Sequence, residues 1–347
     1  MPTRYAANSI LAKVRTKYGK ALTAQNYRDM AALPGVADVA AYLKSRTKYR
    51  TALADVRESA VHRGNLERIL RTGFLNELTA LCKFDRGVGD PFFSCIMVAE
   101  ELDRLKMFLR CLSAGRTAMY AEVAPGAVAT RICVNTVELF SVSNYGGMLK
   151  CITDAALRRI LEQFEAPTGG TFDTMAATAA IDKYRYKYQS AIISRSYSGS
   201  TRSALEEMLR TKAELDNLRM LVRGKNYFSA PPYQLRALMI PARARLSAKD
   251  TDRLIDSASP DEIADFITKK AYAKGGPLGS AADIDEFARR VLYNMYRRTI
   301  RMTTSPAVVM YCYVGLTHIE IENITTVIEG VRYGMDAETI TGMLIYS

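Results

Sequence analysis

The sequence contains no tryptophan and only two histidines, His62 and His318, among its 347 residues. Neither histidine belongs to an HExxH motif or accompanies a recognisable nucleophile motif. The six cysteines form no CxxC pair, and no histidine lies at a ligand-like spacing from any of them. We therefore expect reduced, mostly buried thiols, no metal, no cofactor and no active site.

Long apolar segments and complete phosphate-binding loops are missing as well. The longest apolar run, Ala307–Leu316, is about half the length that crosses a bilayer, and the amino-terminal stretch lacks the apolar run of a signal peptide. The pairs Gly19–Lys20 and Gly224–Lys225 are followed by Ala21 and Asn226, so neither supplies the hydroxyl that such a loop offers to magnesium. We expect a soluble chain that reaches a membrane only through a partner and has no small-molecule substrate.

Cations are in excess, and they are unevenly placed. Lysine and arginine outnumber the acids by 48 to 36, a formal net charge of +12. Residues 1–50 carry ten cations and two acids, whereas residues 303–347 carry one cation and five acids. Such an excess favours acidic proteins, nucleic acid or an anionic membrane surface as partners. The two ends of the chain should face different neighbours.

Two basic runs are candidate contact surfaces. Residues 184–188 alternate tyrosine with arginine or lysine, which suits stacking on single-stranded nucleic acid; a helix that packs its tyrosine face explains the same pattern. The second run is a predicted helix that either contacts an acidic protein surface or faces solvent, and its cations are Arg289, Arg290, Arg297, Arg298 and Arg301. A basic helical scaffold that binds nucleic acid is therefore the alternative function.

Helical periodicity dominates the rest of the chain. Apolar residues recur at i, i+3, i+4 and i+7, and no convincing series of alternating strands appears, so we expect an all-α fold. One helical segment occurs three times, as ELDRLKMFL from Glu101, ELDNLRMLV from Glu214 and EIENITTVI from Glu320. Their starts are 113 and 106 residues apart, which predicts three repeats of about 110 residues.

Two acids bracket the first apolar residue of each copy. We expect them on the flanks of a buried apolar stripe, where salt bridges and capping contacts explain them better than acid–base or metal chemistry. The pairs are Glu101 and Asp103, Glu214 and Asp216, and Glu320 and Glu322. A glycine follows in the second and third copies, Gly224 and Gly330, but Cys111 stands there in the first. The first helical arm is therefore expected to end differently.

A second repeated unit opens at Leu33–Gly35, Ala124–Gly126 and Ile240–Pro241. Each opening leads to a pair of aromatic residues, which are Tyr42 and Tyr49, Phe140 and Tyr145, and Phe266 and Tyr272. Repeats of this length are too long for a solenoid of short units, so each should be a cluster of short helices with one long arm. The expected domains are residues 1–116, 117–225 and 226–347.

The carboxyl end, YCYVGLTHIEIENITTVIEGVRYGMDAETI (Tyr311–Ile340), resembles the closing signature of the C subunits of bacterial and archaeal V/A-type ATPases, which are the counterparts of the eukaryotic d subunits. The likeness extends to ANSILAKVRTKYGKAL (Ala7–Leu22), ALPGVADVAAYLKSRTKY (Ala32–Tyr49) and ELDNLRMLVRGKNY (Glu214–Tyr227). It therefore covers the chain from end to end, although the individual motifs are loose.

This resemblance implies a fold and a function. It implies an all-helical, funnel-shaped protein of three repeats related by pseudo-threefold symmetry. It further implies a non-catalytic rotor component that sits on the membrane proteolipid ring, on the cytoplasmic side, and receives the central-stalk axle subunits. Such a part transmits torque for proton or sodium transport and binds no nucleic acid. The resemblance assigns no residue to either contact.

Overall fold

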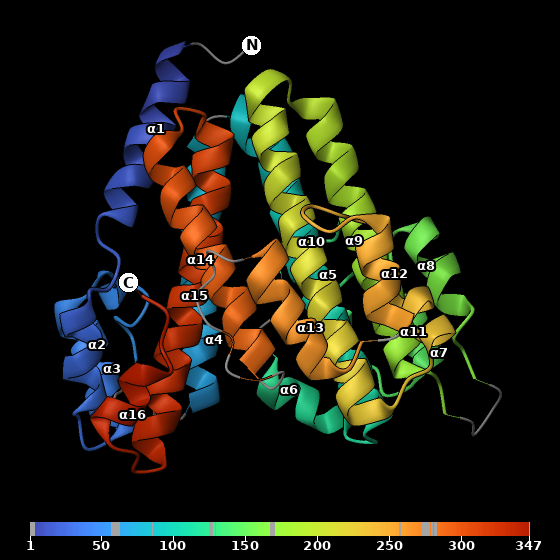
Figure 1. Ribbon diagram of the computed structural model, residues 1–347. Coiled ribbons are helices and arrows are strands. Elements are labelled where there is room, and N and C mark those ends of the chain that lie inside the picture. The colour runs from blue at the N-terminus through green and yellow to red at the C-terminus, as the bar shows by residue number, and fades with distance from the viewer. Residues whose placement is uncertain are drawn as a thin grey trace. The chain divides into compact units, whose positions relative to one another are not determined.

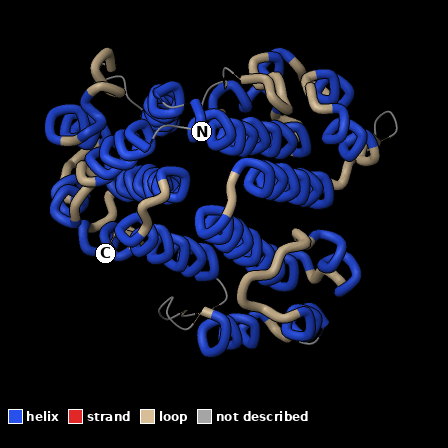
Figure 2. Tube along the Cα trace, turned by 90° about the horizontal axis from the view of Figure 1, so that it is seen from above, coloured by secondary structure: helices blue, strands red, loops and turns tan. Residues whose placement is uncertain are grey.

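A computed structural model places most of the chain. The described residues are 4–56, 63–84, 86–124, 128, 130–166, 171–256, 258–272, 278, 280 and 283–346. They contain sixteen α-helices and no strand, apart from one isolated bridge between Val134 and Ile152. The predicted all-α class is confirmed, and Figure 2 shows helices joined by short loops.

Seven helices are long, and nine are short. The long ones are α1 (Arg4–Tyr18), α4 (Arg63–Phe84), α5 (Arg86–Ser113), α9 (Thr174–Ser196), α10 (Gly199–Phe228), α14 (Ile284–Met302) and α15 (Pro306–Arg332). The short ones are α2 (Ala24–Ala31), α3 (Val36–Arg46), α6 (Tyr120–Val123), α7 (Tyr145–Lys150), α8 (Ala155–Glu162), α11 (Pro232–Leu238), α12 (Ala248–Asp256), α13 (Pro260–Phe266) and α16 (Ala337–Gly342). Figure 1 labels them.

Local sequence signals fix where several helices begin. Thr23 precedes α2 and forms a reciprocal capping box with Asn26, so two of the first free N–H groups are satisfied. Ser259 and Glu262 do the same at α13. Pro306 occupies the first turn of α15, where its missing N–H costs nothing. These caps place the short helices that surround the candidate site.

The chain divides into two compact units. Unit 1 consists of Met1–Phe93, Ala121–Ala127 and Tyr296–Ser347, and unit 2 consists of Ser94–Tyr120 and Val128–Met295. Boundaries fall inside α5, α6 and α14. This grouping by contact does not test the division into three repeats, which stays a prediction.

Helix α15 is the centre of unit 1. It packs against α1, α2, α3, α4 and α16. Residues 307–314 are buried without interruption, as expected for a helix that is apolar on every side and surrounded by others. The apolar run noted in the sequence is therefore core. No helix in the described part of the chain is both long and apolar enough to span a bilayer.

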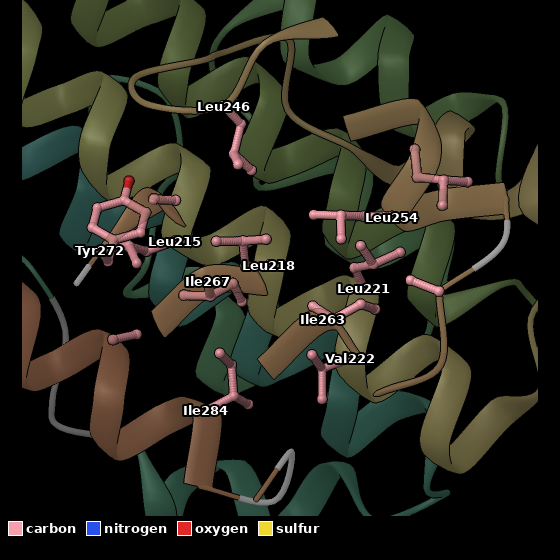
Figure 3. Close-up of a cluster of buried hydrophobic side chains, with 14 of the residues drawn as sticks. Leu215, Leu218, Leu221, Val222, Leu246, Leu254, Ile263, Ile267, Tyr272 and Ile284 are labelled. Atoms are coloured by element: carbon pink, nitrogen blue, oxygen red, sulfur yellow. The ribbon is translucent and has the colours of Figure 1, made fainter. Parts of the chain in front are cut away.

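Unit 2 is built around the pair α9 and α10. Helix α9 also packs against α8 and α11, and α10 packs against α13. Figure 3 shows the core between α10 and the short helices, where Leu215, Leu218 and Leu221 meet Ile263 and Ile267. The apolar stripe predicted after Glu214 is thus the buried side of α10.

Candidate functional site

Three buried glutamates lie within the long helices α5, α10 and α15. Glu101, Glu214 and Glu320 are 0%, 2% and 6% exposed, so they are deeper than the flanking position that their spacing predicted. A buried carboxylate is costly unless hydrogen bonds or a cation replace its water. The partners of these three side chains therefore define the candidate site.

In unit 2, Glu214 binds the segment that leads into α12. Its carboxylate accepts hydrogen bonds from the backbone N–H groups of Ala244, Arg245 and Leu246 at 2.7, 3.0 and 3.0 Å. The hydroxyl of Tyr272 donates to the same carboxylate at 2.6 Å. Burial and the adjoining Glu214 raise the pKa of Tyr272 well above its usual range, so the hydroxyl keeps its proton. Four donors thus tie α10 to the short helices.

Glu101 makes the corresponding contact elsewhere in unit 2. Its carboxylate accepts from the N–H groups of Ile132, Cys133 and Val134 at 3.0, 2.7 and 3.0 Å, and from the Thr130 hydroxyl at 2.6 Å. Both Glu101 and Glu214 reach a segment 31 residues further along the chain. In both copies, therefore, the glutamate accepts hydrogen bonds from a segment 31 residues further along the chain.

Glu320 makes its contact within unit 1, at the opposite end of the sequence. The N–H of Leu22 donates at 2.8 Å and the hydroxyl of Tyr49 at 2.6 Å, while Lys48 Nζ lies 2.7 Å away. Leu22 and Glu320 are 298 residues apart in sequence. The third copy thus binds the amino-terminal cluster of helices.

An asparagine three positions after the glutamate adds a second tie in two copies. Asn217 donates to the carbonyl of Ile240 at 2.8 Å and accepts its N–H at 2.8 Å. Asn323 does the same with Ile345, at 2.7 and 3.1 Å. The first copy has Arg104 instead, which bonds Glu100 in its own helix at 2.9 Å. We call each glutamate, with the asparagine where present, a glutamate clamp.

The repeated glycines let a short helix approach closely. A Cβ on Gly224 would lie 2.6 Å from Leu235 in α11, and a Cβ on Gly330 would lie 2.5 Å from Ile340 in α16. All three arms nevertheless end at a residue with left-handed backbone, which is Gly115, Ser229 or Gly334. The first arm thus shares the left-handed end, and it differs from the other two at the half-buried Cys111, which stands where they have glycine.

The second acid of the first two pairs forms salt bridges outside the clamps. Arg185 of α9 bonds Asp103 at 3.0 Å and lies 3.9 Å from Asp216, so it links α9 to both α5 and α10 within unit 2. Burial raises the pKa of Asp216, but Lys212 and Arg185 outweigh it and lower the value to about 2. Glu322 is half-buried on α15. Asp103 and Asp216 are salt-bridge residues.

The second repeated unit was aligned wrongly. Ile240–Pro241 lies before the segment bound by Glu214, whereas Leu33–Gly35 lies after Leu22, which Glu320 binds. The two openings therefore occupy different places relative to the clamps. Pro125 and Gly126 lie outside the described residues. Of the aromatic pairs, only the members that donate to a glutamate, Tyr49 and Tyr272, correspond in role.

The two basic runs have different surroundings. In residues 184–188, Tyr184 is buried with its hydroxyl 3.4 Å from the Cys133 sulfur, and Arg185 is held by Asp103. Packing and ion pairs within unit 2 thus account for that run. On α14, Arg290 lies 3.6 Å from Glu286, Arg289 and Arg297 are half-buried, and Arg298 and Arg301 are exposed. Partner contact by this helix stays a prediction.

The clamps are suited to holding helices rather than to chemistry. Glu101 and Glu214 each accept four hydrogen-bond donors, and Glu320 faces two such donors and a lysine ammonium, so their lone pairs are engaged. No group of three or more metal-binding side chains occurs in the part of the chain that the structure describes. His318 packs edge-on against Phe74 at 5.5 Å, and His62 lies outside the described residues.

Comparison with known proteins covers nearly the whole chain. The model of the family described as ATP synthase (C/AC39) subunit matches residues 10–343. No curated protein matches the chain. The matched span includes all three clamps and both basic runs.

Proposed function

Because the chain belongs to the ATP synthase (C/AC39) subunit family, we propose that it is the rotor component that links the central-stalk axle of a V/A-type ATPase to the membrane proteolipid ring. The observation that carries this proposal is the family match over residues 10–343. In this role the chain passes torque between axle and ring and is a peripheral component on the cytoplasmic side of the membrane.

The clamps support a mechanical role. A linker under torque must not let its helices slide past one another, and close-packed interiors deform little. Each clamp fixes the middle of a long helix to a neighbouring cluster of short helices by charge-assisted hydrogen bonds, which are about twice as strong as neutral ones. Since the carboxylates are fully engaged, we propose no reaction at them and no active site of the chain's own.

We also propose the three-repeat organisation, with residues 1–116, 117–225 and 226–347 as its sequence units. The three clamps support it, because they recur with the same kind of donors and the same helix ends. We propose in addition that the repeats close in a cycle, which is supported by the contact of Glu320 with Leu22 and Tyr49. A pseudo-threefold funnel is the arrangement that we propose for these repeats.

The arginine face of α14 is our proposed contact with an acidic partner surface, because Arg298 and Arg301 are exposed there. The test of the function is reconstitution of the full chain with purified axle subunits and detergent-solubilised proteolipid ring. We expect a stable complex that contains all three, and weaker assembly for the double variant Arg298→Ala/Arg301→Ala. Failure of the wild-type chain to bind either partner, or micromolar binding to DNA or RNA at physiological salt instead, would contradict the proposal.

A further inference from the structure

Unit 1 has a basic concavity that the clamps do not explain. It lies where the turn after α1 meets the end of α3, and its volume is about 510 Å³, within the range of small-ligand sites. Among its lining residues are Lys20, Asn26, Ser45, Arg46, Lys48 and Arg50. We call it the amino-terminal basic pocket.

The charge of this pocket is one-sided. Four of its lining side chains are cations and none is an acid. Lys48 is bound by Glu320, whereas Lys20, Arg46 and Arg50 are exposed to solvent. Like charges gathered in a concavity repel one another and focus a positive potential that attracts anions. The arrangement therefore costs free energy in the isolated chain and is favourable when an anion occupies it.

The backbone adds to the same potential. Leu22 and Asn26, which flank the first turn of α2, line the pocket, and that turn contains no acidic residue. The amino-terminal end of a helix carries a partial positive charge. The Glu320 carboxylate, which accepts the Leu22 N–H and binds Lys48, offsets part of this potential, so Lys20, Arg46 and Arg50 supply most of the positive charge that faces the pocket.

The donor types favour phosphate over carboxylate. Arg46 and Arg50 supply planar guanidinium groups that bind phosphate oxygens in pairs, and Lys20 adds an ammonium. Three exposed cations around one concavity suit a small ion that carries several negative charges. The carboxylates of an acidic protein surface are spread over a larger area and do not require a concave site. The pair Gly19–Lys20, which lacks the hydroxyl of a nucleotide loop, contributes its lysine here instead.

We propose that the amino-terminal basic pocket binds an anion carrying two or more phosphate groups. The ion contacts Lys20, Arg46 and Arg50, and Lys48 adds the donors that Glu320 leaves available. Because the pocket exists only in folded unit 1, an anion that occupies it stabilises the folded unit. This inference is independent of the proposed rotor function.

The test is calorimetric titration of the full chain with sodium tripolyphosphate at two salt concentrations. We expect saturable binding that weakens with salt, and at least tenfold weaker binding for Lys20→Ala/Arg50→Ala. The matched control is Arg116→Ala/Lys150→Ala, which removes one arginine and one lysine from exposed positions of unit 2 and should change affinity less than twofold. Circular dichroism and thermal unfolding verify that both variants fold. An equal loss of tripolyphosphate affinity in the two variants overturns the proposal. It is also overturned if the wild type binds neither tripolyphosphate nor the phosphatidic acid vesicles described next.

Two further arms identify the source of the phosphate. Vesicles that contain phosphatidic acid, compared with neutral vesicles, show whether a lipid headgroup enters the pocket; vesicle binding that depends on Lys20 and Arg50 supports a lipid source. Tripolyphosphate binding without such vesicle binding supports a soluble ligand. Poly-glutamate that binds more tightly than tripolyphosphate through the same two residues would overturn the phosphate class in favour of an acidic protein segment.

Discussion

The substitution Glu214→Gln tests whether a clamp fixes α10 to its cluster. Glutamine keeps one carbonyl oxygen as an acceptor, but its amide NH2 is a donor. That donor would face groups that now donate hydrogen bonds to the carboxylate. The Oε2 atom accepts from Ala244, Arg245 and Leu246, and Oε1 accepts from Arg245 and Tyr272. An amide nitrogen at the Oε2 position opposes three backbone N–H groups, whereas at the Oε1 position it opposes that of Arg245 and the Tyr272 hydroxyl can turn to accept. In both orientations the remaining hydrogen bonds lose the charge that strengthens them.

The expected cost follows from those lost bonds. A hydrogen bond to a charged group contributes about 1.5–3 kcal/mol, and breaking a buried charged contact costs about 3–5 kcal/mol in other proteins. We therefore expect Glu214→Gln to destabilise unit 2 by about 3–5 kcal/mol. The matched control is Glu207→Gln, the same change at an exposed position of the same helix, which should cost less than about 0.5 kcal/mol.

Hydrogen exchange measured by mass spectrometry locates the effect. If the clamp holds the segment before α12, the amides of residues 244–246 should exchange about a hundredfold faster in Glu214→Gln, since about 3 kcal/mol corresponds to about two powers of ten. Amides of residues 132–134, bound by Glu101, should keep their protection. Equal unfolding free energies for the Glu214→Gln and Glu207→Gln variants, or equal acceleration in both segments, would refute the reasoning.

Three other substitutions extend the account. Gly330→Ala should lower the free energy of unfolding by about 1–3 kcal/mol, measured by thermal unfolding, because its Cβ would lie 2.5 Å from Ile340. The control Gly342→Ala, at a position with open space around it, should lower that free energy little. Asn323→Ala removes both hydrogen bonds to the carboxyl-terminal segment and should cost about 1–3 kcal/mol, with faster exchange at residue 345; unchanged exchange there would count against the second tie. The pKa of Asp216 is lowered to about 2, so its contribution is complete above about pH 4 and is lost as the pH falls toward about 2. Acid unfolding of Asp216→Asn should accordingly depend less on pH over that range, and an unaltered dependence would contradict the assignment.

Helical periodicity was enough to predict the fold class, and a repeated acid pair was enough to find the clamp helices. The depth of the three glutamates was not predictable in the same way. From the sequence, an acidic residue at the edge of an apolar stripe is expected to be exposed to solvent. Only the folded chain shows that backbone N–H groups replace water around Glu101, Glu214 and Glu320. Every residue except proline has a backbone N–H group, so a sequence pattern does not reveal which of these groups will bind a carboxylate.

The contact of Glu320 with the amino-terminal helices was not predictable for another reason. Its partners lie at the opposite end of the chain, 298 residues away for Leu22, and a linear search for repeats looks for each cluster next to its own arm. The alignment of Leu33–Gly35 with Ile240–Pro241 failed because it followed proline and glycine rather than the clamp. Aligning the tyrosines that donate to a glutamate, Tyr49 and Tyr272, would have placed both clusters correctly.

The central claim is that this chain couples the axle to the ring. The most direct measurement is ATP-driven ion transport by proteoliposomes that contain the complete ATPase, assembled with and without the chain. The account predicts that the complex without it hydrolyses ATP but transports no ions, and that adding the chain restores transport without adding a catalytic site. Full transport in its absence would contradict the claim.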